Sequence, residues 1–192
     1  MFGEVTLRGA AGRHTWVVGA AVEREAYRAI DLPQFDFTYL VPGVFAQDDV
    51  TLADWLSLSA SVRVDHHSEY GMFASPRVSA RARAGAWNAR LSAGTGFVGP
   101  SVLTEETEAA GLSRLQIPGR LLAEQGRSAS FDISRADGPA SYTVTLFASR
   151  VNHPIHVDYG DNGLVLTSLS EPTNNAGVEL LATLRQEPFS LT

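Results

Sequence analysis

Two adjacent histidines in the segment VDHHSEY (64–70) are the residues best suited to metal chemistry. His66 and His67 have carboxylates beside them at Asp65 and Glu69, and imidazole together with carboxylate suits several transition metals. In an extended segment, however, neighbouring side chains point to opposite faces, so the two rings do not readily share one ion. We therefore expect a polar strand end here, and no metal site.

Other reactive residue types occur without the partners that catalysis needs. His153 and His156, three positions apart around a proline, are expected to be ordinary loop residues. Glu105, Glu106 and Glu108 would supply paired carboxylates for acid–base chemistry. At the start of a short helix they more simply form a solvated face or favour the helix N-terminus through its dipole. The segment SAGTGF (92–97) lacks the lysine and the following helix of a phosphate-binding loop.

The composition narrows the class of protein further. The chain has no cysteine, which excludes disulfide frameworks, thiolate metal sites and cysteine nucleophiles. Its 15 basic residues, all arginine, are outnumbered by 21 acidic residues, and the formal net charge of −6 argues against a dedicated nucleic-acid binder. We expect neither an enzyme nor a protein with a resident cofactor or catalytic residue.

Regularly spaced arginines are the strongest functional candidates. Arg81 and Arg83 alternate with alanines in VSARARAG, and Arg63 and Arg90 lie in similar alternating segments. Guanidinium groups that face an aqueous cavity attract anionic chelates or pair with the carboxylates of another domain. The simpler alternative is that they hydrate the wall and pair with neighbouring strands. Contact with another domain is the more probable of the two specific roles.

The segments that position these arginines alternate strictly between apolar and polar residues. The clearest examples are LSLSASVRV (56–64), VSARARA (78–84) and SYTVTLFAS (141–149). A period of two over this length predicts β-strands with one apolar face and one polar face. Phe147 is the exception, because it falls on the polar face.

The connections between the strands alternate in length. The short ones are residues 9–13, 51–54, 84–86, 136–140 and 186–190, whereas the longer polar segments are about 26–40, 66–75, 98–126 and 152–174. This rhythm predicts an all-β, antiparallel up-and-down meander of nine or ten strands. In the long connections, residues 100–112 predict a short helix with Ser101 as N-cap and Gly111 as its end, and DNG (161–163) predicts a hairpin turn.

Strand length favours a membrane over water. Segments 55–66 and 140–151 each span about a dozen residues, whereas soluble strands average roughly five or six and tilted transmembrane strands need about 9–11. Trp55 and Trp87 follow short turns, where an interfacial aromatic girdle would lie. The apolar face would then contact lipid, and the arginines would face a water-filled lumen. A soluble sandwich produces the same alternation and stays possible at this point.

An ordered series of motifs resembles one family. The region 44–105, with FAQD before a short turn, RVDHHSEYG at a strand end, SPR at the next strand start and then GTGFVGPSVLTE, is similar to the middle of the barrel in TonB-dependent outer-membrane receptors. NNAGVELLATL (174–184) resembles a later strand of that family, with its glycine and glutamate at Gly177 and Glu179. The resemblance covers nearly the whole chain.

The resemblance implies a transport role and a set of partners. Receptors of this family form a barrel of about 22 strands around an N-terminal plug, in the outer membrane of Gram-negative bacteria. They take up scarce ligands such as ferric siderophores or cobalamin, with energy delivered through TonB. The implied partners are outer-membrane lipid, the receptor's own plug, the TonB complex and a small-molecule or metal-chelate ligand, with no nucleic acid.

The sequence departs from the family pattern at its ends. It shows no export signal, no plug and no closing strand with a terminal aromatic residue, so we expect residues 1–192 to be a single partial barrel domain that does not close. Such a piece leaves unpaired backbone groups along two edges, each costing several kcal/mol in lipid, and is not expected to transport anything alone. The alternatives are another outer-membrane barrel, such as a porin or a translocator, and a soluble secreted β-sandwich binding module.

Overall fold

The structure is a computed structural model that describes residues 1–160, 163–186 and 189–191. Its long strands are β1 (Phe2–Ala11), β2 (His14–Tyr27), β3 (Phe37–Ala53), β4 (Leu56–His67), β5 (Gly71–Ala84), β6 (Trp87–Val98), β7 (Glu124–Asp137), β8 (Ala140–Asn152) and β11 (Thr173–Gln186). The shorter elements are η1 (Pro33–Phe35), α1 (Glu105–Ala110), η2 (Leu112–Arg114), β9 (Ile155–Gly160), β10 (Gly163–Ser168) and β12 (Phe189–Leu191).

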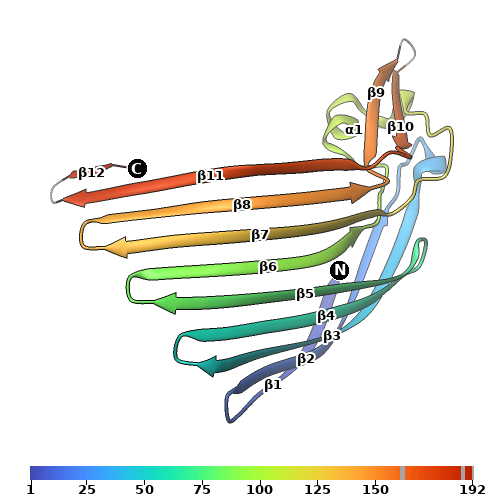
Figure 1. The fold of residues 1–192 in the computed structure, drawn as a ribbon. Helices are drawn as coiled ribbons and strands as arrows, with labels where there is room; N and C mark the ends of the chain where they lie inside the picture. The colour runs from blue at the N-terminus through green and yellow to red at the C-terminus, as the bar shows by residue number, and fades with distance from the viewer. Residues whose placement is uncertain (161–162, 187–188, 192) are drawn as a thin grey trace.

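The long strands form one open antiparallel sheet. Among the described residues its order is β1-β2-β3-β4-β5-β6-β7-β8-β11-β12, so each strand pairs with its neighbour in the chain apart from the excursion through β9 and β10. Figure 1 shows a single curved layer with short turns at one end and α1, β9 and β10 at the other. The prediction of an unclosed meander is confirmed, and the packed second sheet of a soluble sandwich is not formed by the described strands.

The register separates an apolar outer face from a polar inner face. One row across six strands carries the outer-face residues Leu58, Ala80, Leu91, Phe131, Leu146 and Val178. The adjacent row carries the inner-face residues Ser59, Ser79, Ser92, Ser130, Phe147 and Gly177. The outer side chains are not covered by protein, since Leu91 is 56% exposed and Val178 is 68% exposed. A sheet that leaves one broad apolar face uncovered needs another apolar medium to cover it.

Phe147, which broke the alternation, lies on the inner face because its neighbour makes room for it. Gly177 is directly opposite on β11, and a Cβ atom there would lie 2.7 Å from the Phe147 Cζ atom. The phenyl ring therefore covers the glycine backbone, as aromatic residues do when they shield glycine in a neighbouring strand.

The connections agree with the expected rhythm at four short turns and differ at one long segment. Residues 12–13, 54–55, 85–86 and 138–139 form the short turns. The segment 66–75, expected to be a long loop, is mostly strand, with only residues 68–70 between β4 and β5. Polar residues gather on both sides of this short turn, at His66, His67, Ser68 and Glu69, which is why the segment looked like a loop. Positions 187–188 and 161–162, in the last short connection and the DNG turn, lie outside the described residues.

Three long connections pack together into what we call the cap, comprising residues 28–36, 99–123, 153–160 and 163–172. Its core contains Phe35, Leu112, Leu115, Leu164 and Leu166. The segment before β7 joins β10 directly, since the Gln116 amide donates to the Leu164 carbonyl at 2.8 Å. The expected hairpin is formed by β9 and β10. No helix in the part of the chain that the structure describes is long and apolar enough to span a membrane.

The predicted short helix exists, but its start was misplaced. Thr104, not Ser101, is the N-cap of α1, and its hydroxyl accepts a hydrogen bond from the Thr107 amide. Thr107 completes a capping box by accepting from the Thr104 amide at 2.7 Å. Gly111 ends the helix as expected.

Candidate functional site

All four arginines singled out from the sequence lie on the inner face of β4, β5 and β6. Arg81 and Arg90 are direct partners across β5 and β6, Arg83 lies opposite Asn88, and Arg63 lies on β4 opposite Phe45. Arg77, which the sequence analysis did not name, belongs to the same face. Its spacing of four from Arg81 along a period-two strand was the signal that would have found it.

Arg63 is held by a buried carboxylate. Its Nε atom donates to both oxygens of Asp65, at 2.8 and 2.9 Å, and its Nη2 atom lies 2.7 Å from the Asp65 Oδ1 atom. Asp65 is 3% exposed, and Gly43 opposite provides its space, because a Cβ atom there would collide with the carboxylate. Arg63 is therefore a fixed part of the wall.

The arginines of β5 and β6 are not neutralised in this way. Arg81 donates from Nε to the Asn88 Oδ1 atom at 2.5 Å. Asp132, opposite Arg90 on β7, accepts instead from the Thr145 hydroxyl at 2.8 Å. Within the described residues, no carboxylate lies within 4.0 Å of the basic nitrogens of the four arginines of β5 and β6. Like charges directly opposite each other across strands are destabilising, and Arg81 and Arg90 lie in this arrangement.

The tryptophans lie at the short-turn end. Trp87 begins β6 on the outer face, with its ring 5.8 Å from that of Tyr142 and edge-on to it. Trp55 is in the turn before β4, one position earlier than expected, and is 58% exposed. Trp16, which the sequence analysis did not name, lies near the start of β2. Its place just after the short turn at 12–13 was the available signal.

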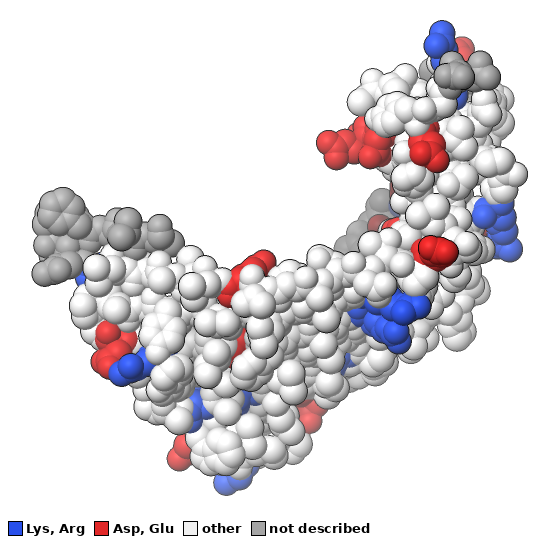
Figure 2. Space-filling view, turned by 45° about the horizontal axis from the view of Figure 1, so that its top comes forward, with Lys and Arg blue, Asp and Glu red and all other residues white. Residues whose placement is uncertain are grey.

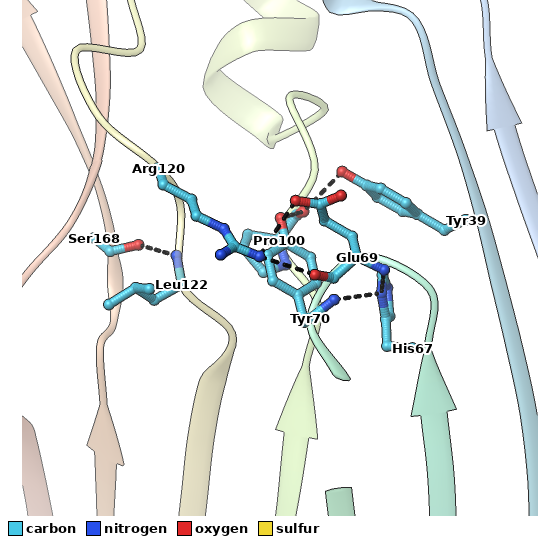
Figure 3. A network of polar contacts seen from close by, with 8 residues as sticks. All are labelled: Tyr39, His67, Glu69, Tyr70, Pro100, Arg120, Leu122 and Ser168. Atoms are coloured by element: carbon cyan, nitrogen blue, oxygen red, sulfur yellow. Dashed lines mark hydrogen bonds and ion pairs between the residues drawn. The ribbon is translucent and has the colours of Figure 1, made fainter. Parts of the chain in front are cut away.

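A network of polar contacts joins the cap to the inner face at the other end of the sheet (Figure 3). The Tyr70 hydroxyl donates to the Pro100 carbonyl at 2.7 Å, and the Tyr39 hydroxyl reaches the same oxygen at 3.4 Å. Burial raises the pKa of the Tyr70 hydroxyl, which keeps it protonated as a donor. Arg120 donates to the Glu69 carbonyl at 3.0 Å and lies 3.5 Å from its carboxylate.

The two adjacent histidines separate as expected. His67 is 5% exposed on the inner side, where its Nδ1 atom accepts from the amides of Glu69 and Tyr70 at 3.2 and 3.4 Å. His66 is exposed on the other face. In the described parts of the chain no group of three or more histidine, aspartate or glutamate residues is arranged to hold a metal ion. His67 therefore shapes the turn at 68–70.

The other candidate groups stay apart. His156 lies 3.1 Å from Asp158 on β9, and both side chains are exposed. The glutamates of α1 lie in its first turn, as the dipole argument expects. What the arrangement offers chemically is a basic patch on the inner face of β5 and β6 and a cap that is fixed to the strands by hydrogen bonds.

Comparison with known proteins decides the family. A family model described as "TonB dependent receptor-like, beta-barrel" matches residues 10–192. The chain belongs to this family. The resemblance seen in the motifs is thus confirmed, and a porin or an unrelated translocator is not the family to which the chain belongs. No curated protein sequence matches it.

Solved structures of this family share the fold at low sequence identity. The siderophore receptor PirA from Pseudomonas aeruginosa matches with a TM-score of 0.80 and 18% identity, over 98% of this chain and 40% of that one. The ferric enterobactin receptor PfeA from the same organism, in complex with BCV-L6, gives 0.75 and 15%, over 98% and 33%. The copper transporter OprC gives 0.74 and 12%, over 96% and 34%. The chain thus spans at most 40% of the length of these three structures.

Proposed function

We propose that this chain forms part of the wall and mouth of an outer-membrane receptor that imports a scarce metal chelate, such as a ferric siderophore, with energy delivered through TonB. The observation that carries the proposal is a single sheet with an apolar outer face, a cluster of arginines on the inner face of β5 and β6 and a structured cap at one end. The outer face would contact lipid, and the inner face would line the path of the ligand.

The named cargo of similar proteins supports the class of ligand. Two of them are described as a siderophore receptor and a ferric enterobactin receptor, and a third as a copper transporter. Cobalamin stays an alternative ligand, because the family resemblance implies it as well. We favour an anionic chelate, because the cluster of arginines on the inner face of β5 and β6 attracts anions.

We assign two different roles to the four predicted arginines. Arg63 already has Asp65 as its partner, so we assign it to the wall. Arg81, Arg83 and Arg90 are proposed to face carboxylates of the receptor's own plug domain, or the ligand in passage. Residues 1–192 are assigned to a single barrel domain, with Trp55 and Trp87 at the membrane interface.

Uptake of radioactive iron tests the proposal directly. A strain that lacks the receptor containing this chain is compared with its parent and with a TonB-deficient strain, each given ferric enterobactin, ferric citrate or ferric hydroxamate. We expect both deficient strains to lose uptake of one of these probes. An R81A/R90A receptor should lose much of it, whereas R135A, which changes an outer-face arginine, should not. The 192-residue chain alone should restore nothing.

The proposal would be contradicted by unchanged uptake of every probe in the receptor-deficient strain under iron limitation. It would also be contradicted if the chain alone restored uptake. Equal loss in R81A/R90A and R135A would remove the inner arginines from the account while leaving the receptor itself in place.

A further inference from the structure

Two arginines on the outer face are unusual because they lie directly opposite each other, next to a band of apolar residues. Arg127 on β7 and Arg150 on β8 are direct partners across the two strands, near the end of the sheet that carries the cap. At the opposite end the outer face is bounded by the row of Trp87, Arg135 and Tyr142. The outer-face residues between these two boundaries are apolar, and on β7 they are Ala129, Phe131 and Ile133.

The arginine pair differs electrostatically from the arginine at the other boundary. Arg135 is neutralised by Asp137 at 2.7 Å and lies 5.6 Å from the centre of the Trp87 ring. Arg150 makes one contact, from Nε to the Asn152 Oδ1 atom at 3.4 Å. Among the described residues no carboxylate lies within 4.0 Å of the basic nitrogens of Arg127 or Arg150.

Two arginines directly opposite each other on neighbouring strands are costly unless an anion lies between them. Like charges directly opposite each other in a sheet repel, and an arginine on a lipid-facing surface is tolerated only near the membrane interface. Figure 2 shows a sheet face with few charged side chains and a group of basic atoms toward the end that carries the cap. The position of the arginine pair and the repulsion between its two positive charges together favour a negatively charged lipid headgroup as the ligand.

An apolar groove begins directly beside the pair. It is an open depression of about 650 Å³ on the outer face, and Arg127 and Arg150 line one side of it. The outer-face residues that line the rest include Pro76, Val78, Ala93, Ala129, Ala148 and Ala176. The small side chains of this row leave a trough between the arginines and the larger Leu91, Phe131 and Leu146 of the next row.

We propose that Arg127 and Arg150 together bind the phosphate of a phosphorylated lipid in the outer leaflet, with one of its acyl chains in the groove. Arginine binds phosphate through paired, charge-assisted hydrogen bonds, and clustered basic residues at a membrane surface attract anionic lipid headgroups. A free phosphate ion would satisfy the arginines but not the groove, so the lipid is the occupant. This inference rests on the proposed function, because the outer face meets lipid only in a membrane barrel.

The test measures lipid retained by the intact receptor that contains this chain. The receptor is reconstituted in phosphatidylcholine nanodiscs that contain a small share of lipid A, a phosphorylated glycolipid, and bound lipid A is counted by native mass spectrometry. Each arginine should be worth about tenfold in affinity, and R127A/R150A about a hundredfold. R135A is the matched control and should retain wild-type binding. R127K/R150K should retain part of it, since lysine keeps the charge without the bidentate geometry.

Three results would overturn the inference. They are equal lipid A retention by wild type and R127A/R150A, an equal loss in R135A, and displacement of lipid A by an equimolar amount of inorganic phosphate. Iron uptake by the same variants separates this failure from failure of the proposed function. If the R127A/R150A receptor retains lipid A as the wild type does and still takes up iron, only the lipid site is refuted. If the wild-type receptor takes up no iron, the proposed receptor function is refuted.

Discussion

The cap and the sheet of this protein are stabilised by different means. The cap buries Phe35, Leu112, Leu115, Leu164 and Leu166 against one another, as a small water-soluble domain does. The sheet buries almost none of its large side chains against protein. Its strands are held by continuous antiparallel hydrogen bonding, and its outer leucines and valines stay exposed.

The difference shows which medium each region is built for. Removing apolar surface from water stabilises a fold by roughly 25 cal/mol per Å². This hydrophobic effect stabilises the core of the cap. In lipid the corresponding requirement is that every backbone polar group be paired, which the strand ladders satisfy. A substitution in the cap should therefore change stability through packing. In the sheet, the effect of a substitution should depend on whether the residue lies on the outer or the inner face.

The largest effect is expected from a cavity in the cap. Leu166 is 0% exposed, and truncating a fully buried leucine to alanine costs about 2–5 kcal/mol. L166A should open the cap while the sheet stays folded, which hydrogen exchange of cap amides against β7 and β8 amides would show. Leu169, 38% exposed, supplies the control, and L169A should change little. Simultaneous loss of protection in the cap and the strands would contradict the separation of the two regions.

A charge on the sheet should matter only on one face. Leu146 lies in the middle of the outer face, and an arginine at the centre of a bilayer costs about 2–4 kcal/mol. L146R should therefore lower the free energy of unfolding of the receptor in bilayers, measured with urea. The preceding residue is the matched position, because Thr145 lies on the inner face between Asp132 and Glu179. T145R should be nearly neutral, and an equal cost at both positions would refute the assignment of faces.

The smallest effect concerns the contact that joins the two regions. Y70F removes the hydroxyl that donates to the Pro100 carbonyl at 2.7 Å, and the loss of such a bond costs about 0.5–1.5 kcal/mol. Faster hydrogen exchange in residues 101–104, with no change in the strands, is the expected result. Y39F should do less, because its hydroxyl lies 3.4 Å from the same oxygen. A larger effect from Y39F would show that the shorter bond does not fix the cap.

The sheet was predictable because its information is local. Alternation in LSLSASVRV and VSARARA sets the faces without knowledge of neighbours, and the short turns set the order. For the same reason the alternation alone predicts that Arg63, Arg81, Arg83 and Arg90 share one face of the sheet, and in the register they do. What local pattern cannot give is the cross-strand partner. That Asp65 neutralises Arg63, or that Gly177 admits Phe147, depends on register.

The helix and the hairpin of the cap were predictable, but its core was not, because that core is assembled from distant segments. Phe35, Leu115 and Leu166 come from three different connections, and none of these segments shows a regular apolar period. The start of α1 at Thr104 also depends on a contact outside the helix, since the Thr107 hydroxyl donates to the Val102 carbonyl at 2.7 Å. Residues 66–75 were misjudged because polar residues surround the turn, although β4 continues to His67 and β5 begins at Gly71.

The most direct test of the account is the phase of accessibility along β7. Because the chain contains no cysteine, single cysteines can be placed at Ser128, Ala129, Ser130 and Phe131 in turn, and spin-labelled in the membrane-embedded receptor. The account predicts that labels at 129 and 131 collide with lipid-dissolved oxygen, whereas those at 128 and 130 collide with a water-soluble nickel complex. A reversed alternation, or none, would contradict a wall with lipid on its outer face and water on its inner face.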